Sequence, residues 1–97
     1  MTIVNNIIYE ALENINLERI DKDPIEISEA TRLFGEKGEL DSLELVSLVV
    51  DVEERVEDEF GTMLSLTNEA VLNQNPSPFS SVKALSAYIT NTLETKN

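Results

Sequence analysis

Three stretches of this 97-residue chain repeat apolar residues at the three- to four-residue spacing of an α-helix. The first runs from about Thr2 to Arg19, the second from Ser42 to Glu59 and the third from Ser81 to Leu93. Such spacing gathers the apolar side chains on one face of each helix, and these faces must pack on one another. The segment from Thr67 to Leu72 predicts one further, short helix. We therefore expect an all-α fold that forms a single domain over residues 1–97.

The composition excludes several kinds of chemistry. The chain has no cysteine for a disulfide or a thiolate, and no histidine for a general base or a metal ligand. Its first residues lack the basic start and apolar run of a signal peptide, and no apolar run is long enough to span a bilayer. A net charge of −12 disfavours nucleic acid and anionic membranes as partners and favours basic protein surfaces. We expect a cytoplasmic monomer with no membrane insertion.

The acidic charge is concentrated around the second predicted helix. Ten acidic residues and two basic residues lie between Gly35 and Phe60. The helix itself separates its apolar residues into two groups. The group that should face the core consists of Leu45, Leu48, Val49, Val52, Val56 and Phe60. The second group, Leu43, Val46 and Val50, forms a stripe beside that face. This stripe is either part of a wide core-facing surface, with Val46 partly buried, or a small docking strip rimmed by carboxylates.

A long connection, from about Ile20 to Asp41, leads into this helix. Pro24 forbids a continuous helix through the residue before it. Ser28 to Thr31 is long enough for one turn, and we expect Leu33 and Phe34 to anchor the connection on the core.

Ser42 stands where this connection becomes the second helix. A phosphate ester on its hydroxyl would lie over the helix N-terminus, where free backbone N–H groups and the positive end of the dipole favour an anion. The stretch Gly38-Glu39-Leu40-Asp41-Ser42-Leu43-Glu44-Leu45-Val46 resembles the attachment site of acyl carrier proteins. The resemblance extends over Leu33 to Gly61 and over Phe79 to Ile89. It implies a small four-helix bundle of acyl-carrier type, with three long helices and a short third helix.

The resemblance also implies a function without catalysis. Ser42 would bear a covalent 4′-phosphopantetheine arm that a phosphopantetheinyl transferase takes from coenzyme A, and the flanking residues Asp41 and Leu43 would help to present it. The carrier would deliver a thioester-bound acyl or aminoacyl group to acyl- or aminoacyl-loading ligases and acyl-processing enzymes with basic docking surfaces. The partner-binding residues would be Leu43, Glu44, Val46, Val50, Glu53, Glu54 and Glu57. No metal site of its own is expected.

Two departures from the usual family pattern leave the carried group open. Glu39 and Leu40 separate Gly38 from Asp-Ser-Leu, which is closer to the Leu-Asp-Ser pattern of D-alanyl and other specialised carriers. The segment between Gly61 and Ser81 is also longer than in carriers of housekeeping fatty acid biosynthesis.

Two other classes of function compete with this interpretation. The chain could be an acidic helical protein–protein adaptor in which Ser42 is only a helix N-cap, since serine is common at that position. It could also be an enzyme, but Ser42 has no histidine to activate it and no obvious lysine base nearby. The spacing of the carboxylates indicates a helix surface rather than a converging catalytic or metal-binding cluster, and no EF-hand pattern is present.

Overall fold

The structure is a computed structural model that describes residues 2–20, 23–34, 38–66 and 77–95. Three helices make up most of the described part: α1 (Thr2–Glu18), α2 (Ser42–Phe60) and α4 (Val82–Thr95). Each boundary lies within two residues of the one predicted from apolar spacing. The all-α class is therefore confirmed, but the count of four helices is not. The short helix predicted over Thr67–Leu72 lies outside the described residues.

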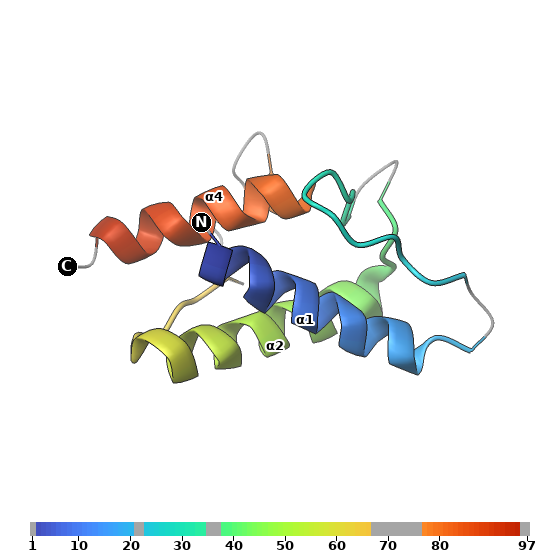
Figure 1. The fold of residues 1–97 in the computed structure, drawn as a ribbon, viewed down its shortest axis with the longest axis horizontal. Coiled ribbons are helices and arrows are strands. Elements are labelled where there is room, and N and C mark those ends of the chain that lie inside the picture. Colours follow the sequence, from blue (N-terminus) through green and yellow to red (C-terminus); the bar gives the residue numbers. More distant parts are fainter. Residues whose placement is uncertain (1, 21–22, 35–37, 67–76, 96–97) are drawn as a thin grey trace.

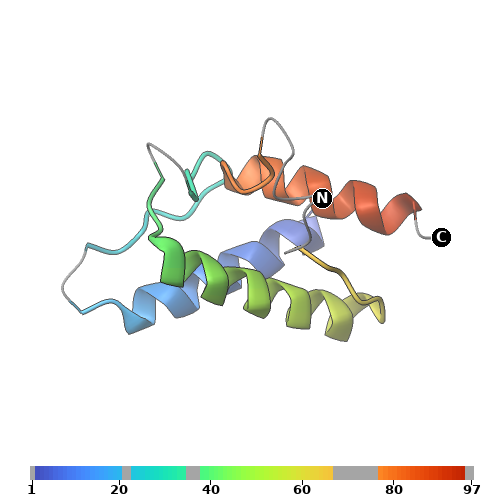
Figure 2. The same cartoon turned by 180° about the vertical axis from the view of Figure 1, so that it is seen from behind.

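The helix α1 lies in the middle of the molecule and packs against both of the others (Figure 1). Both α2 and α4 run in the direction opposite to α1, as the view from behind also shows (Figure 2). No helix in the described ranges combines the length and apolarity needed to cross a membrane.

Residues from every described segment contribute to one aliphatic core. The helix α1 buries side chains on adjacent turns, α4 buries Val82, Leu85 and Ile89, and the connections add residues between the helices. The buried apolar residues outside α2 and α4 are Val4, Ile7, Ile8, Ala11, Leu12, Ile15, Ile25, Leu33, Leu40, Leu64, Leu66 and Phe79. Removing this much apolar surface from water is the main source of stability in a fold with few aromatic residues.

The helix α2 buries most of the face that its spacing predicted. Leu48, Val49, Val52 and Val56 are buried, and Leu45 packs partly buried against the same core. The prediction that Phe60 is buried is wrong, because its side chain is 38% exposed. The last turn of α2 extends beyond the start of α1 (Figure 1), so α1 does not cover this end of the helix.

Backbone hydrogen bonds hold the connection before α2 against the start of α4. The Leu33 N–H donates to the Ser80 carbonyl at 3.1 Å, and the Val82 N–H donates to the Thr31 carbonyl at 3.0 Å. Leu33 is fully buried, as predicted, whereas Phe34 is 42% exposed and anchors the connection less than expected. The predicted turn at Ser28–Thr31 is present, with a hydrogen bond from the Thr31 N–H to the Ser28 carbonyl at 3.2 Å.

Gly38 lets this connection fold back tightly before it reaches α2. A Cβ atom at this position would lie 2.6 Å from the Phe34 Cα and 2.7 Å from the Leu33 carbonyl oxygen. The Leu40 N–H can then donate to the Leu33 carbonyl at 2.9 Å, which brings the end of the connection back onto its own buried part. The path of the chain into α2 is therefore fixed two residues before Ser42.

Candidate functional site

A reciprocal pair of hydrogen bonds closes the N-terminus of α2. The Asp41 carboxylate accepts from the Glu44 N–H at 2.8 Å, and the Glu44 carboxylate accepts from the Asp41 N–H at 3.1 Å. This arrangement is a capping box, which satisfies backbone donors that a helix start leaves without partners. At the other end, Gly61 adopts the left-handed conformation with φ 66° and donates to the Glu57 carbonyl, which ends the helix as predicted.

Ser42 is the first residue of α2 and is exposed. Asp41, and not Ser42, is the N-cap, so the N-cap role that the adaptor interpretation gave to this serine is wrong. The two hydrogen bonds of the capping box join Asp41 and Glu44 and do not involve the Ser42 hydroxyl. The serine is thus presented at the surface by a helix start whose stability does not depend on it.

Arg19 holds the capping box from the side of α1. Its Nε and Nη2 atoms donate to the two oxygens of the Glu44 carboxylate at 2.9 and 3.1 Å. The hydrogen bonds from this guanidinium hold the pKa of the Glu44 carboxyl below its ordinary value, against the opposing effect of burial. Only 6% of the Arg19 side chain and 17% of the Glu44 side chain are exposed. The Glu44 carboxylate is therefore held by contacts within the protein, whereas the sequence had placed it among residues that bind partners.

The apolar stripe next to Ser42 faces solvent. Leu43 is 80% exposed, Val46 60% and Val50 46%. The interpretation of these residues as part of a wide core-facing surface is wrong, and Val46 is not partly buried as that interpretation required. These three apolar side chains, three and four residues apart on an acidic helix, form a small patch that a partner protein can cover.

The other predicted partner residues line a shallow depression beside α2. It is lined by Val50, Glu53, Glu54 and Glu57 together with Met63 and Leu64 from the segment after the helix. Met63 is largely exposed and was missed by the sequence analysis. An isolated methionine after the helix stop carries no periodic signal, so only the return of this segment along α2 could reveal its position.

The acidic side chains of this depression differ in what they contact. The Glu53 carboxylate accepts from the Leu66 N–H at 2.7 Å and so holds the segment after α2 against the helix. Glu54 and Glu57 are exposed. Four acidic residues were predicted to meet a partner. Two of them, Glu44 and Glu53, make contacts within the protein, whereas the side chains of Glu54 and Glu57 are exposed at the surface.

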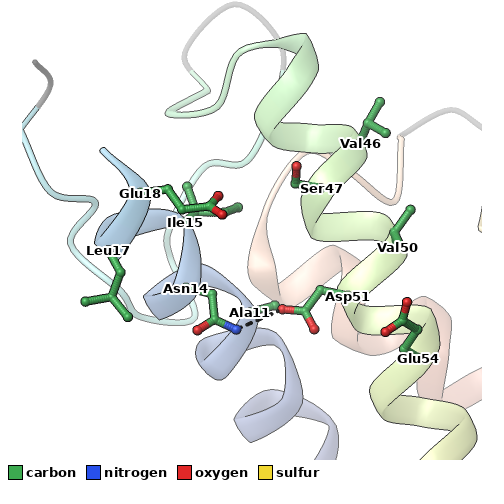
Figure 3. Close-up of a pocket in the computed structure, with 10 residues that line it drawn as sticks. All are labelled: Ala11, Asn14, Ile15, Leu17, Glu18, Val46, Ser47, Val50, Asp51 and Glu54. Carbon is green, nitrogen blue, oxygen red and sulfur yellow. Dashed lines mark hydrogen bonds between the residues drawn. The ribbon is translucent and has the colours of Figure 1, made fainter. Parts of the chain in front are cut away.

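A second groove runs between α1 and α2 (Figure 3). The Asn14 amide crosses it and donates to the Asp51 carboxylate at 3.2 Å, and Glu18 and Glu54 add further carboxylates. Val46 and Val50 line the same groove from the side of α2 (Figure 3). The apolar stripe therefore borders the groove between α1 and α2, and Val50 also lines the depression that contains Met63.

The described residues contain no group of three or more acidic side chains placed to hold a metal ion. Comparison of the chain with protein-family models, with curated proteins and with solved structures finds no match in any of the three.

Proposed function

We propose that this chain is an acyl carrier protein, in which Ser42 bears a 4′-phosphopantetheine arm and presents a thioester-bound group to biosynthetic enzymes. One observation carries the proposal. Ser42 is exposed at the first position of a helix that is capped by its neighbours, and an apolar stripe begins at the next residue. The hydroxyl is accessible to a transferase, and its modification would break no hydrogen bond of the cap.

The residues around Ser42 fit a phosphate ester. The first backbone N–H groups of a helix and its dipole favour a negative group at this position. Asp41 and Glu44 alone would oppose such a group, since both are acidic. Arg19 offsets one of these charges through its paired contact with the Glu44 carboxylate. The carboxylates near the serine therefore repel a phosphate less than the acidic sequence implies.

The arm, when bound, supplies the reactive thiol, which accounts for a carrier without cysteine. The protein supplies attachment, exposure and recognition. Partners with basic surfaces would cover Leu43, Val46 and Val50 and meet the carboxylates of Glu54 and Glu57. Exposed ion pairs contribute only about 0–1 kcal/mol each, so such a surface permits fast exchange among several enzymes. Its charge acts mainly on the rate of encounter.

Transfer of the arm in vitro tests this function. Incubation with coenzyme A, Mg²⁺ and a broad-specificity phosphopantetheinyl transferase should add one phosphopantetheine to the wild-type chain, as measured by intact mass. Ser42→Ala should take none. Ser47→Ala is the matched control, because Ser47 is also an exposed serine on α2 and its replacement should leave transfer unchanged. Transfer to the Ser42→Ala variant would refute the attachment site.

Failure of the wild-type chain to accept the arm would favour the adaptor function instead. An adaptor would use the same exposed apolar stripe but would need no group on Ser42.

Charge reversal tests which carboxylates meet the transferase. Glu54→Lys with Glu57→Lys should slow transfer, and the wild-type rate should fall as ionic strength rises. Glu53→Lys is a poor probe of docking, because it also removes the contact with the Leu66 N–H. Val50→Asp should weaken the complex at every salt concentration. Equal rates for the wild type, the double variant and Val50→Asp would place recognition on another surface.

A further inference from the structure

Arg19 is a nearly buried cation at the point where α1 ends. Its backbone N–H still donates to the Ile15 carbonyl at 3.1 Å, which keeps the residue on the last turn of the helix. Burial of a guanidinium is unfavourable unless its charge and its donors are satisfied. The side chain meets that condition through contacts with three separate parts of the chain.

These contacts join both ends of the long connection to the start of α2. Nη1 donates to the Asp23 carbonyl at 2.7 Å, near the beginning of the connection. Nη2 donates to the Glu39 carbonyl at 2.6 Å, near its end, and the guanidinium also binds both oxygens of the Glu44 carboxylate. One side chain therefore fixes the end of α1, the path of the connection and the capping box relative to one another.

We infer that Arg19 is a positioning residue for Ser42, which it holds in the orientation that a transferase recognises. This inference rests on the proposed function. Ser42 lies between Asp41 and Leu43, and its backbone is fixed by the cap that Arg19 supports through Glu44. Loss of the guanidinium removes two hydrogen bonds to the Glu44 carboxylate and unties the capping box from the end of α1. The first turn of α2 then opens more often, and only the closed fraction can bind the transferase productively.

Arg55 provides a matched control within the same chain. It also makes ion pairs, with Asp51 at 2.9 Å and Glu10 at 3.4 Å, but its side chain is 31% exposed and lies in the middle of α2. Replacement of either arginine by glutamine removes one positive charge, so both variants change the net charge of the protein equally. A difference between them must come from the position of Arg19.

The experiment measures the kinetics of arm transfer and amide hydrogen exchange for Arg19→Gln, Arg19→Lys and Arg55→Gln. We expect Arg19→Gln to raise KM roughly tenfold with kcat nearly unchanged, and Arg55→Gln to stay within about twofold of the wild type. Arg19→Lys should fall between them, because an ammonium cannot bind both Glu44 oxygens in the same planar geometry. Exchange should accelerate in Arg19→Gln at residues 42–46 and remain slow at Val52 and Leu85.

Equal KM values for Arg19→Gln and Arg55→Gln would overturn the inference, as would unchanged exchange at residues 42–46. If Arg19→Gln loses amide protection throughout the helices, the variant is unfolded and cannot test the inference. The KM values of Arg19→Lys and Arg55→Gln are then compared instead, and equal values would overturn the inference. A wild-type chain that takes no arm would refute the proposed function. The exchange measurement would still decide whether Arg19 holds the first turn of α2.

Discussion

Two neighbouring valines on α2 allow the assignment of its faces to be tested with one substitution. Val49 is 3% exposed and packs in the core, whereas Val50 is 46% exposed. Val49→Asp removes the burial of a valine, worth about 1.5–3 kcal/mol, and places a carboxyl group among aliphatic side chains. An uncompensated buried charge brings the expected loss to roughly 3–5 kcal/mol of unfolding free energy. A domain of this size has only about 5–15 kcal/mol in total.

Val50→Asp introduces the same group and the same charge one position away, and should cost less than about 1 kcal/mol. Urea unfolding, followed by the far-ultraviolet circular dichroism of the helices, measures both losses of unfolding free energy. The deficit of Val49→Asp should also shrink as the pH falls. Burial raises the pKa of the new carboxyl, so its protonated form is favoured in the folded state. Equal urea midpoints for the two variants would refute the assignment of the buried face.

Three further predictions concern the ends of α2 and its charge. Because Arg19 lowers the pKa of Glu44, the stabilising contact is present at neutral pH and is lost as the pH falls below the ordinary glutamate value of about 4.3. The difference in unfolding free energy between the wild type and Glu44→Gln should therefore narrow from pH 7 towards acid, and a constant difference would contradict this. Gly38→Ala should destabilise by up to about 3 kcal/mol, since its Cβ would meet backbone atoms of Phe34. Gly61→Ala should cost only about 1–2 kcal/mol, because alanine is strained in the left-handed backbone of this position but its Cβ would meet nothing within 4 Å. Equal urea midpoints for Gly38→Ala and Gly61→Ala would contradict this ranking. NaCl or MgCl₂ should raise the melting temperature in a thermal scan by screening the carboxylates of α2, and no change would contradict that repulsion.

Local patterns were sufficient to predict the helices and most of their buried faces. Apolar spacing located α1, α2 and α4, and Gly61 marked the end of α2 because few other residues adopt its left-handed conformation. Periodicity alone failed at Phe60. The spacing gives the direction of a side chain from its helix but not whether another element covers it. That depends on where α1 begins along α2.

The contacts that surround Ser42 were harder to foresee. The spacing of Asp41 and Glu44 is that of a capping box, and this signal could have assigned both residues to the cap. The resemblance to acyl carrier proteins predicted Glu44 on the docking surface instead. No local rule pairs Glu44 with Arg19, which lies 25 residues earlier. Their contact requires the crossing of α1 and α2 and the path of the connection between them.

The state of Ser42 in the protein isolated from the cells that produce it shows whether the serine carries the arm. Intact mass spectrometry followed by fragmentation of the peptide that spans residues 38–46 would identify any attached group and its position. We expect one 4′-phosphopantetheine, free or acylated, on the Ser42 hydroxyl. A chain that carries no such group, or that carries it on another residue, would refute the proposed carrier function.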